Sequence, residues 1–210
     1  MTIKTQRLLA RAKKIAKKGE HEEALKLYTT ILEASPNNQD AKNGLLKLQQ
    51  GKDQLRPPKE EVQSVYALYS NGQIQEALDT VETLIKGYPK EPLLYNISGA
   101  CYKEIGQLEK AFKNFEKAVS LKPDYAEALY NLGITLRELG QVDAAIGCYE
   151  KALAIKPDYA EAHNNLGNAF KELGQLDDAV KSYEKALTLK SDYAEAHNNL
   201  DIVLKQLSSK

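Results

Sequence analysis

Hydrophobic and small residues recur along this chain with the spacing of helices that have one buried face. Between residues 126 and 139, Leu129, Leu132 and Leu136 follow one another at intervals of three and four. These intervals place side chains on one face of an α-helix. Ala145 and Tyr149 continue a similar pattern between residues 142 and 155. The pattern therefore predicts two amphipathic helices joined by a short turn.

Glycine and proline mark the expected ends of these two helices. Gly140 follows the first helix, and glycine commonly ends helices. Pro157 follows the second helix, where it blocks any continuation because proline has no backbone N–H to donate. Asp124 and Glu127 stand three residues apart just before and inside the first helix. This spacing is compatible with a capping box, in which side chains satisfy the first backbone N–H groups.

The helical hairpin is repeated with a period of 34 residues. Residues 125–158 and 159–192 are identical at 20 of 34 positions, which chance does not produce. The same step separates the members of three sets: Gly72, Gly106, Gly140 and Gly174; Ala77, Ala111, Ala145 and Ala179; and Tyr125, Tyr159 and Tyr193. One such unit is too small to bury a sufficient core, so we expect stability to come from stacked neighbours.

These repeats resemble the tetratricopeptide repeat (TPR) family. The repeat at 126–159 carries the matching residues Leu132, Gly133, Leu136, Ala145, Tyr149, Ala152 and Pro157. The repeat that follows it has Ser191 in the slot of Pro157. The resemblance implies an all-α fold, a right-handed α-solenoid of TPR helix-turn-helix hairpins with a C-terminal capping helix. It also implies that Gly133 and Ala145 face each other, so that the two backbones can approach closely.

The repeat register breaks once near the N-terminus. Gly19 and Gly72 are 53 residues apart, which is one period plus 19. The added residues include a helical pattern at 39–50, followed by a polar stretch that ends in two prolines. We therefore predict an N-terminal hairpin plus an extra helix at 1–50, a linker at 51–57, and four repeats at 58–91, 92–125, 126–159 and 160–193. Whether 1–50 stacks on the repeats or swings about the linker stays open.

The last segment, 194–210, repeats the pattern of a first helix without a second helix after it. Asp201 takes the slot of the packing glycine, which is compatible with a face that meets water. We expect a capping helix and tail, of the kind that seals the open end of repeat arrays. The alternative is that the chain was cut from a longer protein.

Asparagines form the strongest candidate site. Asn131, Asn165 and Asn199 stand one repeat apart on the polar face of the first helices. An asparagine both donates and accepts hydrogen bonds, so such a row can bind an extended peptide backbone. The row is similar to the asparagine ladder in the TPR superhelix of O-GlcNAc transferases, which implies a concave peptide-binding groove. The candidate groove residues are Asn131, Asn165, Asn199, Asn164, Asn168, Asn198, Tyr130, Arg137, Lys171 and Lys205.

Glutamates beside this row limit the kinds of ligand, and the row itself has a competing interpretation. Glu127, Glu161 and Glu195 project beside the row and would repel the acidic chaperone tails that some TPR domains bind. The competing interpretation of the asparagines is that they are solvated polar positions on regular repeats.

A second candidate surface lies on the N-terminal helix. Arg7, Arg11, Lys14 and Lys18 share one face, which could contact an acidic partner, RNA or an anionic membrane. The alternative is a solvated helix face that only aids solubility. Because no aromatic residue is interleaved among these charges, no nucleic-acid partner is expected.

Composition narrows the class of protein. The chain has 210 residues, and its 29 basic and 29 acidic side chains cancel. Residues 1–58 nevertheless carry +6 and residues 59–210 carry −6, so a homo-oligomer is possible. No apolar run is long enough to span a membrane. The two cysteines have neither disulfide-framework nor metal-site spacing. No cofactor and no metal are expected, and a cytoplasmic location is the default.

The sequence carries no phosphate loop, no Ser-His-Asp candidate and no pair of buried carboxylates. We therefore expect a non-enzymatic scaffold for protein–protein interactions that binds an extended segment of a protein or peptide partner in its concave TPR groove. One alternative is a substrate-recruiting TPR arm of a larger, glycosyltransferase-like enzyme. Another is a self-assembling scaffold in which the basic end of one copy meets the acidic body of the next.

Overall fold

The computed structural model describes residues 3–18, 20–53 and 56–209. Over these residues it contains twelve helices and no strand, which confirms the predicted all-α class. The chain divides into two compact units, Met1–Pro58 and Lys59–Lys210. Each unit has its own hydrophobic core and is described by itself.

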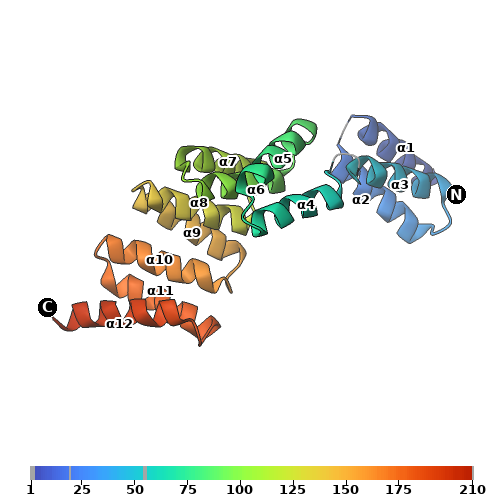
Figure 1. Ribbon diagram of the computed structural model, residues 1–210. Helices are drawn as coiled ribbons and strands as arrows, with labels where there is room; N and C mark the ends of the chain where they lie inside the picture. The colour runs from blue at the N-terminus through green and yellow to red at the C-terminus, as the bar shows by residue number, and fades with distance from the viewer. Residues whose placement is uncertain (1–2, 19, 54–55, 210) are drawn as a thin grey trace. The chain divides into compact units, whose positions relative to one another are not determined.

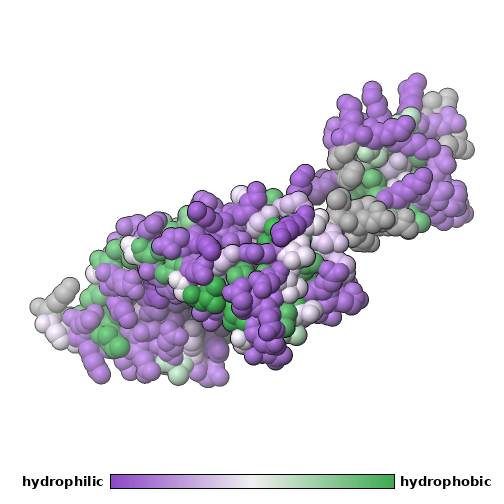
Figure 2. All heavy atoms as spheres, turned by 45° about the horizontal axis from the view of Figure 1, so that its top comes forward, coloured by the Kyte–Doolittle hydropathy of each residue, from purple (hydrophilic) through white to green (hydrophobic). Residues whose placement is uncertain are grey.

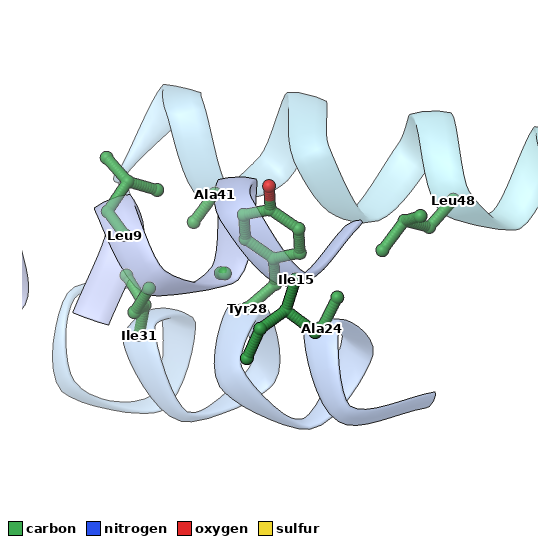
Figure 3. Close-up of a cluster of buried hydrophobic side chains, with 8 residues drawn as sticks. Leu9, Ile15, Ala24, Tyr28, Ile31, Ala41 and Leu48 are labelled. Atoms are coloured by element: carbon green, nitrogen blue, oxygen red, sulfur yellow. The ribbon is translucent and has the colours of Figure 1, made fainter. Parts of the chain in front are cut away.

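The unit Met1–Pro58 is a three-helix block. It consists of α1 (Ile3–Lys17), α2 (His21–Ala34) and α3 (Gln39–Asp53), with α1 and α3 both packed against α2. Figure 3 shows its core, which is formed by Leu9, Ala12, Ile15, Ala24, Tyr28, Ile31, Ala41 and Leu48. Helix α3 is the extra helix that the sequence pattern predicts. It continues to Asp53, so the first residues of the predicted linker 51–57 are helical, while 54–55 lie outside the described residues.

The unit Lys59–Lys210 is a stack of helical hairpins (Figure 1). Its helices are α4 (Lys59–Ser70), α5 (Ile74–Gly87), α6 (Pro92–Glu104), α7 (Leu108–Leu121), α8 (Ala126–Glu138), α9 (Val142–Ile155), α10 (Ala160–Glu172), α11 (Leu176–Leu189) and α12 (Ala194–Ser208). Helices α4 to α11 pair in chain order, each pair packs on the next, and α12 packs on α11. This is the predicted solenoid of helix-turn-helix hairpins followed by one single helix.

Glycines in a left-handed conformation close the hairpins. The φ angles of Gly72, Gly106, Gly140 and Gly174 lie between 72° and 76°. At the end of α8 the N–H of Gly140 donates to the carbonyl of Arg137, and the N–H of Gln141 donates to the carbonyl of Leu136, both at 2.9 Å. A side chain is strained at this φ, so glycine is the residue that allows the turn.

The small first-helix residue packs against an aromatic ring of the second helix. A Cβ atom on Gly133 would lie 2.6 Å from Cε1 of Tyr149, so this ring leaves no room for a side chain at position 133. The same contact recurs between Gly99 and Phe115 and between Gly167 and Tyr183. The glycine therefore makes room for a fully buried aromatic ring on the second helix of its own hairpin.

The predicted capping box is wrong. Helix α8 begins at Ala126, so Asp124 precedes the N-cap position, which is Tyr125, and no side chain caps the helix there. Tyr159 and Tyr193 take the same place before α10 and α12. A lysine three residues earlier lies over each of these rings, with ammonium-to-centroid distances of 5.0 Å for Lys122, 4.3 Å for Lys156 and 5.0 Å for Lys190. These cation–π contacts help to fix the turn that leads into the next hairpin.

Tyr149 and Tyr183 occupy equivalent buried positions, but we expect removal of their hydroxyl groups to change the free energy of unfolding in different ways. The hydroxyl of Tyr183 donates to Oδ1 of the buried Asn168 at 2.8 Å. The hydroxyl of Tyr149 is buried without a partner among the described residues, because Ile134 occupies the slot of Asn168. We expect Tyr183→Phe to lower the free energy of unfolding by about 1–2 kcal/mol, and Tyr149→Phe to leave it unchanged or raise it. Urea unfolding followed by circular dichroism measures both; equal losses would contradict the assignment.

Candidate functional site

The predicted asparagine row is built from the first helices of consecutive hairpins. Asn131, Asn165 and Asn199 lie half-buried on α8, α10 and α12. Each donates its side-chain amide to the preceding first helix: Asn131 to Oδ1 of Asn96 at 3.1 Å, Asn165 to the hydroxyl of Tyr130 at 2.9 Å, and Asn199 to Oδ1 of Asn164 at 3.2 Å. The row therefore exists, and its members are fixed by hydrogen bonds between neighbouring repeats.

Two of these acceptors are buried amides that hold glutamates in place. Asn96 is 3% exposed and donates to Oε1 of Glu127 at 3.2 Å. Asn164 is 1% exposed and donates to Oε1 of Glu195 at 2.9 Å. Asn164, a predicted groove residue, is thus too buried to contact a ligand over much of its surface. It acts instead as a support that positions Asn199 and Glu195.

Tyrosine rings lie close to one another and near these glutamates. The ring of Tyr130 lies 4.7 Å from that of Tyr159 and 6.1 Å from that of Tyr149, in tilted arrangements. Burial raises the pKa of Tyr130 and Tyr159, and the nearby glutamates raise it further. Burial, followed by Glu195, raises the pKa of Tyr193 to about 12. These phenols are therefore neutral hydrogen-bonding groups at neutral pH.

We name the resulting area the first-helix surface. It consists of the half-buried or exposed residues Tyr125, Glu127, Tyr130, Asn131, Tyr159, Glu161, Asn165, Tyr193, Glu195 and Asn199. The direct contacts between α6 and α8, α8 and α10, and α10 and α12 make it continuous.

The other predicted groove residues are placed less uniformly. The side chain of Asn168 is 8% exposed and accepts a hydrogen bond from the hydroxyl of Tyr183. Asn168 is therefore not exposed on this surface. Asn198 is exposed on α12. Arg137 forms an ion pair with Glu172 at 3.2 Å, and Nζ of Lys171 lies 3.5 Å from Oδ1 of Asn199. Lys171 and Lys205 line one hollow near the C-terminal ends of α10 and α12.

Sequence reasoning missed the roles of Asn96, Tyr125, Tyr159 and Tyr193. The repeat register contained a signal for Asn96, because this residue stands two periods before Asn164 and one before Tyr130. From the sequence alone, the tyrosines at the 34-residue step indicate only the repeat.

The predicted basic surface on α1 and the following Lys18 is exposed and partly neutralised within its own unit. Arg7, Arg11, Lys14 and Lys18 are all exposed. Arg11 forms an ion pair with Glu23 of α2 at 2.9 Å, and the neighbouring Lys13 pairs with Asp40 of α3 at 3.0 Å. Figure 2 shows that polar side chains cover much of the visible face of both units.

Two kinds of feature are absent from the described residues. They contain no group of three or more His, Cys, Asp or Glu side chains arranged to hold a metal ion. No helix among them is long and apolar enough to cross a membrane.

Comparison with known proteins identifies the family. The model of the TPR repeat family matches residues 99–136, 135–174 and 167–208, which together span just over half of the chain. The chain therefore belongs to the TPR repeat family.

Individual relatives agree with this assignment. The chain is 31% identical over 64 residues to the peroxisomal targeting signal receptor of Kluyveromyces lactis. The matched segment is 30% of this chain and 11% of that protein. The chain spans about a tenth of the length of the curated relatives it matches. The crystal structure of MamA superimposes with a TM-score of 0.57 at 27% identity, covering 91% of this chain and 94% of MamA. YrrB, described as a TPR protein with an unusual peptide-binding site, shares the fold with a TM-score of 0.58 at 20% identity, over 91% of this chain and 89% of YrrB.

Proposed function

We propose that the first-helix surface binds an extended segment of a partner protein, and that the chain acts as a protein-interaction scaffold rather than as an enzyme. This proposal rests on the hydrogen bonding of the Asn131 and Asn165 side chains. Each uses one amide N–H to bond the preceding repeat, while its Oδ1 accepts no hydrogen bond from the described residues. A fixed and unused acceptor can receive a backbone N–H of a ligand at little cost in side-chain entropy.

The environment of the two cysteines bears on the non-enzymatic part of this proposal. Cys101 is fully buried, and burial raises the pKa of its thiol to about 11. Burial likewise raises the pKa of the Cys148 thiol. Since the thiolate is the reactive form, neither cysteine is suited to act as a nucleophile near neutral pH.

The structure indicates which asparagine gives the cleanest test. Removing Asn131 or Asn199 would leave the carbonyl oxygen of a buried asparagine without its donor, at a cost of about 1–3 kcal/mol in stability. Asn165 instead donates to the half-buried hydroxyl of Tyr130. Asn165→Ala therefore removes a proposed ligand contact with the least effect on folding.

The experiment is a selection of peptides from a random display library with the full chain, followed by fluorescence anisotropy on the tightest peptide. We expect Asn165→Ala to weaken binding roughly three- to tenfold, as loss of one hydrogen bond predicts. Asn114→Ala is the matched control because Asn114 lies on α7, a second helix. The proposal fails if no peptide is selected, or if both variants bind as tightly as the wild type.

A further inference from the structure

Three carboxylates of the first-helix surface are spaced one repeat apart. Glu127, Glu161 and Glu195 lie in the first turns of α8, α10 and α12. Among the described residues, no lysine or arginine forms an ion pair with any of them. The acidic charge of this row is therefore not compensated by a direct ion pair within the described part of the chain.

Buried side chains fix two of the three carboxylates. Asn96 and Asn164, which hold Glu127 and Glu195, are each less than 5% exposed. A glutamate that only stabilises the start of its helix needs no such support, because the helix dipole acts without a fixed side-chain geometry. The support keeps these carboxylates at defined places beside Asn131 and Asn199.

The tyrosines of the same surface are suited to cations. Tyr125, Tyr159 and Tyr193 each stand two residues before one of the three glutamates. The ring of each already takes a lysine ammonium of this chain over one face, at 4.3–5.0 Å. Aromatic faces next to carboxylates favour lysine and arginine side chains.

Two cations of the first helices, Arg137 and Lys171, lie at the opposite helix ends and have partners. Arg137 and Lys171 are in the last turns of α8 and α10. Arg137 pairs with Glu172, and Lys171 bonds Asn199. The acidic row is thus separated from this basic row along the helices, and residues 59–210 as a whole carry a net charge of −6.

We propose that the first-helix surface selects a basic extended segment, whose lysine or arginine side chains contact Glu127, Glu161, Glu195 and the neighbouring tyrosine rings. This inference rests on the proposed function, in which the asparagines bind the backbone of the same segment. Charge complementarity then sets which sequences bind, while the asparagines act on any sequence.

The first part of the test uses the composition of the peptides selected from the random library. We expect lysine and arginine to be enriched over the unselected library, and binding to weaken as the salt concentration rises. If peptides bind and depend on Asn165 but are not basic, this inference is wrong and the proposed function stands. If no peptide is selected, both are wrong.

The second part compares two triple variants with the same selected basic peptide. Glu127→Gln, Glu161→Gln and Glu195→Gln together keep the acceptor oxygens for Asn96 and Asn164 but remove the charge, and we expect roughly tenfold weaker binding. The control changes Glu116, Glu150 and Glu184 to glutamine; these exposed residues have the same 34-residue spacing on the second helices, and less than a twofold effect is expected.

Two results would overturn the inference at this stage. Equal affinities of the two triple variants would place the recognition of basic side chains elsewhere. A wild-type dimer in light scattering that the Glu127, Glu161 and Glu195 triple variant no longer forms, with no peptide selected, would identify the occupant as a second copy of the chain.

Discussion

Replacing Gly133 with leucine is expected to lower the free energy of unfolding of the unit Lys59–Lys210 by about 3 kcal/mol. The new Cβ alone would lie 2.6 Å from Cε1 and 2.8 Å from Cδ1 of Tyr149. The ring of Tyr149 is fully buried, so it cannot move aside without disturbing its neighbours. The expected drop in thermal midpoint is roughly 6–12 °C for a unit of this size.

Gly147 provides a control for helix propensity. This glycine lies on α9, and a Cβ at its position would meet no atom within 4 Å. Gly147→Ala is therefore expected to raise stability by up to about 1 kcal/mol, because alanine favours the helix over glycine. Opposite signs for Gly133→Leu and Gly147→Ala in thermal unfolding would tie the loss to the Tyr149 ring. A stabilised Gly133→Leu variant would show that helix propensity outweighs the clash.

The hairpins were predictable because their signals are local and repeated. The spacing of Leu129, Leu132 and Leu136 and the glycine step of 34 residues place the helices of the repeats to within a few residues. The start of α8 was less predictable, since Asp124 and Glu127 have capping-box spacing while the chain uses Tyr125 at the N-cap position. Helix ends depend on the turn geometry, and here Lys122 and the Tyr125 ring form part of that turn.

The candidate site was predictable in outline and not in its contacts. The 34-residue step was enough to align Asn131, Asn165 and Asn199 on successive first helices. Their partners belong to the preceding hairpin, where the residue varies between asparagine and tyrosine, so the bonds depend on how the hairpins stack. Stacking also explains why Asn164 is buried beside α12 whereas its equivalent, Asn198, is exposed.

Gly44→Leu is expected to unfold much of the unit Met1–Pro58 without affecting the hairpins of the other unit. A Cβ on Gly44 would lie 2.6 Å from Cε1 and 2.8 Å from the hydroxyl oxygen of Tyr28, which is 3% exposed in the core of this unit. An overpacking cost of about 3 kcal/mol is a large part of the roughly 3–9 kcal/mol that stabilises a unit of this length. Figure 3 shows the Tyr28 ring among the core side chains that this change would displace.

Hydrogen exchange measured by mass spectrometry separates the two units of the intact chain. Gly44→Leu should remove protection from α2 and α3 and leave that of residues 99–208 at the wild-type level, because the two units have separate cores. Lys47→Leu introduces the same side chain at an exposed position of α3 and is expected to keep protection in both units. Loss of protection in both units with Gly44→Leu would mean that they unfold as one. Unchanged protection in α2 and α3 would mean that the Tyr28 ring can leave the core at little cost.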